Sequence, residues 1–162
     1  MLDEPNYSKI LGVISTCKST AKLYNFIDNA ERKNVPIVLE AAIRRLASLV
    51  PDYAIGSFEY DFWKTLRTYE LVLREDGQTN ARLFKTREKV EREGIEKVLS
   101  DWAMLKLNQW VFDHLIEKGM SDLTGESVIL RHKERFAEDV IEAATQRLNL
   151  KSLTFEDEIH HI

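Results

Sequence analysis

The chain has 162 residues, with three prolines, six glycines, 44% hydrophobic residues and 31% charged residues. This is the length of one ordinary domain, and the apolar content is too high for an intrinsically disordered chain. Twenty-three Lys and Arg stand against 27 Asp and Glu, which gives a formal net charge of −4 and an isoelectric point near 5.6. The chain therefore lacks the overall basic field of many nucleic-acid-binding proteins, and any such binding requires a local basic patch.

The composition also excludes several kinds of chemistry. A single cysteine, Cys17, permits neither an internal disulfide nor a zinc site of four thiolates. The first five residues are acidic where a secretory signal is basic, and no apolar run approaches the roughly 20 residues that span a bilayer. No phosphate-binding glycine loop, nucleophile elbow or His-Glu-x-x-His motif is present. We therefore predict a cytoplasmic protein with no membrane segment, no cofactor, no bound metal and no catalytic residue.

Apolar residues recur every three or four positions through most of the chain, which is typical of amphipathic helices. Ser19 or Thr20 can begin a helix that ends at Asn34, and Pro36 can begin a second helix that ends before Pro51. The short connection predicts that these two helices form an antiparallel hairpin. The sequence thus predicts an N-terminal helical hairpin within residues 1–50.

Residues 51–57 have no periodic pattern and contain a proline and a glycine, so we expect a connector and the best internal boundary there. A long helix is predicted from about Phe58 to Arg74, closed by Asp76-Gly77. Its inward face combines aromatic and aliphatic side chains at helical spacing: Phe58, Phe62, Leu66, Tyr69 and Leu73.

The remaining pattern predicts five shorter helices. We expect them at about 80–93, 95–103, 110–119, 123–131 and 137–150, with Gly94 and Gly119 as turns and Thr124 or Ser121 as a cap. Residues 57–150 would then form a main helical body that shares one core with the hairpin, and 151–162 an acidic, aperiodic tail. The predicted fold is all-α, a compact multi-helix domain of seven or eight short helices built from antiparallel hairpins.

Residues 78–97 contain six basic side chains against four acidic ones. On a helix with about 100° per residue, Arg82, Lys85, Lys89 and Arg92 fall in one stripe. Such a basic ridge could contact the phosphates of DNA or RNA, with salt-sensitive and weakly sequence-selective binding. The candidate nucleic-acid-binding residues are Arg82, Lys85, Arg87, Lys89, Arg92 and Lys97.

Two observations oppose this hypothesis. The acidic residues Glu88, Glu91, Glu93 and Glu96 could neutralise the ridge, for example through four-residue pairs from Glu88 to Arg92 and from Lys89 to Glu93. The order helix, Gly94, helix is the outline of a helix-turn-helix motif, but the second helix offers acidic side chains that DNA repels. If DNA is bound, the helix before Gly94 would contact it.

Aromatic residues are concentrated on the helix predicted over 58–74. Tyr60 and Trp63 fall outside its main apolar stripe, with Lys64 and Arg67 close by in the sequence. One interpretation is a partner-binding surface around Tyr60 and Trp63, and the other is a helix buried on two sides. Asp52, Glu59, Asp61 and Lys64 have the residue types of a metal-dependent nuclease, but the spacing is wrong for that site.

Rigid helical packing favours a binding surface over a deep catalytic cleft. The first hypothesis is therefore a non-enzymatic helical binding module that contacts nucleic-acid phosphates through the basic ridge. The alternative is a protein-protein interaction or scaffold module, including a homodimer, that does not bind nucleic acid.

Overall fold

A computed structural model describes residues 6–75 and 81–160 of the chain, with side chains for 6–74 and 83–149. This described part is built from helices and contains no strand, which confirms the all-α class. The chain divides into two compact units, Met1–Pro51 and Asp52–Ile162. The boundary coincides with the start of the predicted connector, while a core common to both units stays a prediction.

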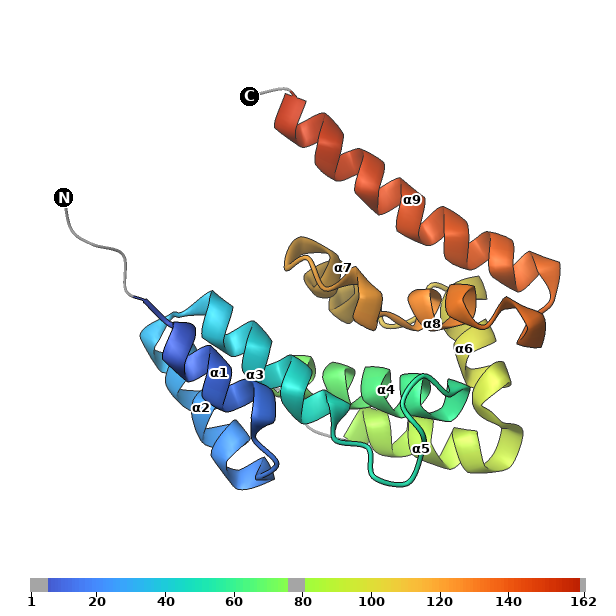
Figure 1. Ribbon diagram of the computed structural model, residues 1–162. Coiled ribbons are helices and arrows are strands. Elements are labelled where there is room, and N and C mark those ends of the chain that lie inside the picture. Colours follow the sequence, from blue (N-terminus) through green and yellow to red (C-terminus); the bar gives the residue numbers. More distant parts are fainter. Residues whose placement is uncertain (1–5, 76–80, 161–162) are drawn as a thin grey trace. The chain divides into compact units, whose positions relative to one another are not determined.

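Unit 1 contains the helices α1 (Ser8–Thr16), α2 (Thr20–Lys33) and α3 (Pro36–Ser48), and the last two form the predicted hairpin (Figure 1). Ser19 caps α2, since its hydroxyl accepts a hydrogen bond from the backbone N–H of Lys22 at 3.3 Å. Asn34 ends α2 in the left-handed conformation, with φ at 53°. Both predicted helix boundaries are therefore confirmed.

Helix α1 is an addition to the predicted set. Gly12 and several β-branched residues lower the intrinsic helix propensity of residues 8–16, and Ile14 is the residue of α1 that is buried. Packing against α3 stabilises this helix. The apolar spacing of residues 8–16 alone therefore does not predict it. With α1 included, the described residues contain nine α-helices instead of seven or eight.

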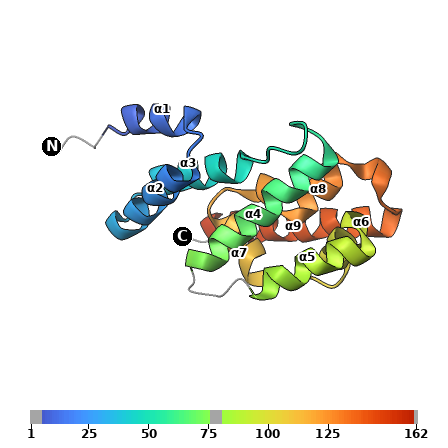
Figure 2. The same cartoon turned by 90° about the horizontal axis from the view of Figure 1, so that it is seen from below.

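Unit 2 contains the remaining elements, and its short helix α8 (Gly125–Arg131) lies beside α4 and α9 (Figure 2). Helix α8 contacts α4, α6 and α9, and α6 also contacts α5 and α9. The elements of unit 2 are α4 (Phe58–Glu75), α5 (Ala81–Glu93), α6 (Ile95–Met104), α7 (Gln109–Glu117), η1 (Ser121–Leu123), α8 (Gly125–Arg131), η2 (Lys133–Arg135) and α9 (Glu138–His160), where η1 and η2 are 3-10 turns.

The predicted stripe of α4 is buried in full. Phe58, Phe62, Leu66, Tyr69 and Leu73 are each at most 3% exposed. Gly94 and Gly119 turn the chain with φ at 93° and 71°, and Thr124 caps α8 by accepting from the backbone N–H of Ser127. The expected stop at Asp76-Gly77 and the expected start at Asn80 lie outside the described residues.

The end of the chain differs from the prediction. Residues 151–160 continue α9 as helix up to His160, where an aperiodic tail was expected. The segment contains no proline or glycine to stop a helix that is already nucleated in unit 2, so propagation costs little. None of the described helices combines the length and the apolar character that crossing a membrane requires.

Candidate interaction surface

The basic residues of the phosphate hypothesis are largely engaged by carboxylates. Arg87 on α5 donates to Glu70 on α4, with 3.0 Å between Nε and Oε1. Lys89 on α5 and Lys97 on α6 both donate to Asp101, the latter over 2.9 Å. Hydrogen bonds from Lys89 and then Lys97 lower the pKa of the Asp101 carboxyl, so this acid stays ionised and holds both cations.

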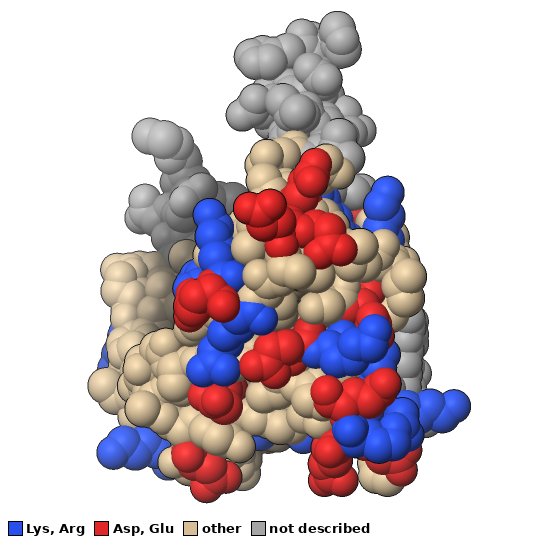
Figure 3. Space-filling view, turned by 90° about the vertical axis from the view of Figure 1, so that its right-hand side faces the viewer, with Lys and Arg blue, Asp and Glu red and all other residues tan. Residues whose placement is uncertain are grey.

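Among the described residues, two other members of the ridge keep exposed cationic groups. Arg92 is well exposed with its guanidinium 3.9 Å from the Glu93 carboxylate, and Lys85 is exposed. The side chain of Arg82 lies outside the described residues. Acidic and basic side chains alternate over the face shown in Figure 3, with no single-sign field. The local balance of charge therefore counts against phosphate binding.

The aromatic surface expected around Tyr60 and Trp63 is mostly interior. Tyr60 is 5% exposed and does not form a surface, while Trp63 is half-buried, with Phe62 at its edge and the Arg87 guanidinium 5.4 Å from its ring centroid. Neighbours cover α4 on more than one side because it is an inner helix of unit 2. Of the two interpretations of Tyr60 and Trp63, the helix that is buried on two sides agrees with this geometry.

Asp61, one of the four residues with the types but not the spacing of a nuclease site, belongs to a charge cluster. The Asp61 carboxylate accepts from the His132 ring over 2.7 Å and from the Arg131 guanidinium over 3.4 Å. These partners lie at the end of α8 and link it to the start of α4. In the part of the chain that the structure describes, no three His, Cys, Asp or Glu converge as metal ligands. Asp61 thus serves packing between two helices.

The most exposed apolar cluster of unit 2 lies between α6 and α7. Within the seven residues 104–110, four large apolar side chains face solvent: Met104 at 45%, Leu105 at 64%, Leu107 at 37% and Trp110 at 43% exposed. We call residues 104–110 the apolar corner. Two of its residues that are not glycine, Lys106 and Asn108, have positive φ values of 51° and 57°. Such conformations cost free energy and persist where the surroundings impose them.

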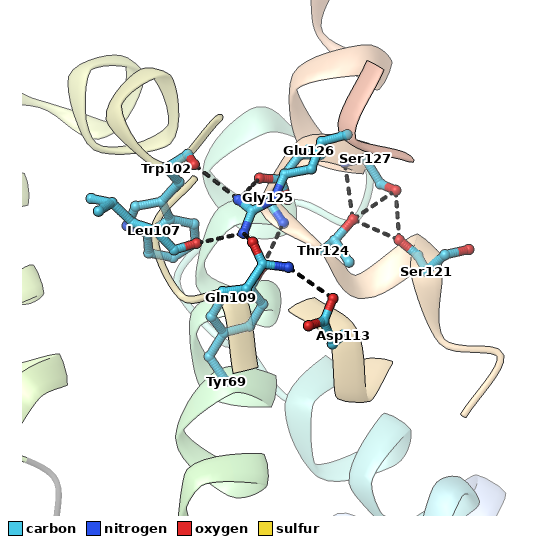
Figure 4. Close-up of polar contacts among 11 residues, drawn as sticks. Tyr69, Trp102, Leu107, Gln109, Asp113, Ser121, Thr124, Gly125, Glu126 and Ser127 are labelled. Carbon is cyan, nitrogen blue, oxygen red and sulfur yellow. Dashed lines mark hydrogen bonds and ion pairs between the residues drawn. The ribbon is translucent and has the colours of Figure 1, made fainter. Parts of the chain in front are cut away.

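Polar groups of Trp102, Leu107, Gln109 and Glu126 converge beside the apolar corner (Figure 4), and each of them accepts a hydrogen bond from one buried arginine. Arg147 of α9 is 6% exposed, and its guanidinium donates to the carbonyl of Trp102 and to the carbonyl of Leu107, each over 2.9 Å. The same group donates to the Gln109 side chain over 3.3 Å. Arg147 therefore holds both ends of the turn from one point, and the corner is a fixed structure.

Glu126 of α8 balances the charge of Arg147. One carboxylate oxygen accepts from Arg147 over 2.7 Å, and the residue is 1% exposed. Burial raises the pKa of Glu126, and the charge of Arg147 lowers it in part. The second carboxylate oxygen, Oε2, is buried without a hydrogen-bond partner among the described residues. A buried ion pair with an unsatisfied oxygen is costly to break, because removal of one partner leaves the other charge without compensation.

The helix that carries Glu126 is fixed by close packing at its first residue. The backbone N–H of Gly125 donates to the buried hydroxyl of Tyr69 over 3.0 Å. The Trp102 ring stacks on the Tyr69 ring with 4.9 Å between centroids. A Cβ atom on Gly125 would lie 2.6 Å from Cε3 of Trp102, so only glycine fits there.

A pocket of about 390 Å³ adjoins the apolar corner. Its first wall comes from the end of α6 and the start of α7, with Ala103, Met104 and Phe112 as apolar residues. Its second wall is one face of α9, formed by Asp139, Glu142, Ala143 and Gln146, and Arg147 also lines the pocket. A volume of this size falls in the range of ligand-binding pockets.

Comparisons of the chain with protein-family models, with curated proteins and with solved structures find no match. The candidate site therefore stands on its geometry.

Sequence reasoning missed the apolar corner and Arg147. A signal for both is present in the sequence. Met104, Leu105 and Leu107 are apolar residues that lie outside every predicted helix, and Trp110 directly follows them at the start of the helix predicted over 110–119. Arg147 follows Val140 and Ala144 at spacings of four and three, which places it on the buried stripe of α9. A charged residue on a buried stripe indicates a specific partner in the interior.

Proposed function

We propose that the chain is a non-enzymatic protein-interaction module that receives its partner on the apolar corner and the adjoining pocket. The observation that carries this proposal is the exposure of four large apolar side chains on a turn held by a buried arginine. Exposed apolar side chains that cluster on a rigid surface are typical of interaction sites, whereas scattered ones are ordinary. The partner is expected to be a cytoplasmic protein, since a lone cysteine suits a reducing compartment.

Site-specific photo-crosslinking tests the proposal. A photoreactive phenylalanine analogue at Leu105, in cells that normally make the protein, should give an adduct of discrete mass. The same analogue at Ile55, which is 86% exposed in the connector, is the matched control and should give none. Substitution Trp110→Ser should reduce the Leu105 adduct several-fold, because it removes apolar contact area. Equal adducts at both positions, or none at Leu105, would contradict the proposal.

Nucleic-acid binding through the basic ridge is the competing proposal, and the ion pairs of Arg87, Lys89 and Lys97 make it the less favoured. We expect no saturable binding of a labelled DNA duplex in anisotropy titrations at about 50 mM and about 200 mM salt, since free cations are needed to displace counterions. Binding that weakens with salt and disappears in the Lys85→Glu/Lys89→Glu variant would instead support the ridge.

A further inference from the structure

The pocket beside the apolar corner is lined by α9 from Asp139 to Arg147. Its α9 wall uses Asp139, Glu142, Ala143 and Gln146, which share one face of the helix at spacings of three and four. Residues 139 to 146 span about 10 Å of helix axis, or two turns, at 1.5 Å per residue. The opposite wall continues at Met104 into the exposed apolar corner. This shape is a short groove beside a helix, and it suits a second helix lying along α9.

The groove carries a specific pattern of charge. Asp139 and Glu142 are exposed along its α9 side, and no described basic residue pairs with either carboxylate. Asp139 accepts a hydrogen bond from the backbone N–H of Val140, and Glu142 accepts one from the Gln146 side chain over 3.2 Å. Among the basic residues that line the pocket, Arg147 forms an ion pair with buried Glu126, whereas Lys106 lies on the opposite wall. The α9 wall therefore carries acidic side chains, and the wall from α6 and α7 carries apolar ones.

We infer that the occupant of this groove is an amphipathic helix of a partner protein, with a large apolar side chain in the pocket and Lys or Arg residues facing Asp139 and Glu142. This inference rests on the proposed function and adds the chemistry of the partner. In helix-in-groove recognition, the bound helix places apolar anchor residues at spacings of three and four. The residues of the α9 wall that line the groove recur at the same spacings. Charge at the rim then selects orientation and partner, because opposite charges attract and like charges are excluded.

A displayed library of random amphipathic helices, selected on the purified full chain, tests the inference. The Leu105→Asp variant serves as counter-target, so that helices bound elsewhere are removed. We expect the enriched helices to carry Lys or Arg next to a large apolar residue. The best helix should bind about five- to tenfold more tightly in anisotropy titrations than its twin with Glu at the basic positions, as expected for two exposed ion pairs.

Two variants of the chain assign this charge preference to the groove. Asp139→Asn/Glu142→Gln keeps the shape and should remove the preference, whereas Glu91→Gln/Glu134→Gln removes the same charge from exposed positions outside the pocket and should keep it. Helices enriched without basic residues, or a preference that survives in the first variant, would overturn the inference and leave the proposed function intact. If the selection enriches no helix, the inference that a helix occupies the groove is wrong. The photo-crosslinking experiment at Leu105 then tests the proposed function separately. A chain that is dimeric in light scattering, and monomeric as Leu105→Asp, would replace the partner helix by a second copy.

Discussion

The variant Arg147→Met should lower the free energy of unfolding of unit 2 by about 3–5 kcal/mol, the cost of leaving a buried charge without its partner. Glu126, 1% exposed, would lose its counter-charge, and the carbonyls of Trp102 and Leu107 would lose their donor. Urea unfolding monitored by tryptophan fluorescence measures the effect. The signal reports unit 2, because the three tryptophans lie at positions 63, 102 and 110.

The control is the double variant Glu126→Gln/Arg147→Met, which removes both charges. We expect it to be more stable than Arg147→Met alone, because a neutral amide is less costly to bury than an uncompensated carboxylate. A double variant no more stable than the single one would mean that the ion pair is not the source of the loss.

The stability lost in Arg147→Met should also depend on pH. Burial already raises the pKa of Glu126, and removal of Arg147 raises it further because the lowering influence of that charge is gone. A carboxyl whose pKa is higher in the folded than in the unfolded state contributes stability at low pH and loses it as the pH rises. The difference between wild type and variant should therefore grow from about pH 4, near the ordinary pKa of glutamate, to pH 7.

The variant Gly125→Ala should lower the free energy of unfolding of unit 2 by about 2–3 kcal/mol, as expected for overpacking of a full core. The new Cβ would lie 2.6 Å and 3.1 Å from ring atoms of Trp102 and 3.2 Å from Leu99, so the stacked ring and α8 must move apart. The hydrogen bond from Gly125 to Tyr69 would then lengthen in a buried environment. Fluorescence-monitored urea unfolding again measures the change.

Gly119→Ala is the matched control for this variant. Gly119 has φ at 71°, and a Cβ atom at this position would have no neighbouring atom within 4 Å, so alanine there suffers backbone strain alone. We expect a loss of about 1 kcal/mol, smaller than that of Gly125→Ala. Equal losses in the two variants would show that the contact with Trp102 does not limit residue size at position 125.

Local signals predicted most of the fold. The caps Ser19, Asn34 and Thr124 and the turns Gly94 and Gly119 act within a few residues of themselves, so the sequence near each one suffices. The stripe of α4 is equally local, because its period depends on the helix alone. Helix α1 is different, since α3 stabilises it from a distance in the sequence.

The candidate site could be predicted only in part, because its partners come from distant elements. The expected four-residue pairing of Lys89 with Glu93 considered one helix, whereas the structure pairs Lys89 with Asp101 of the next helix, and Arg87 with Glu70 of α4. Tyr60 has a similar explanation: helical spacing tells which residues share a face, and tertiary packing decides which faces are covered. The apolar corner depends on Arg147, more than 35 residues further along the chain.

That separation sets an order of events during synthesis. The corner leaves the ribosome well before Arg147, so the carbonyls of Trp102 and Leu107 have no hydrogen bond from that side chain until the last helix is translated. Until the last helix docks, Lys106 and Asn108 have nothing to compensate their unfavourable backbone angles. The exposed apolar side chains of the corner therefore reach their final arrangement at the end of folding, so the surface of the proposed function would form last.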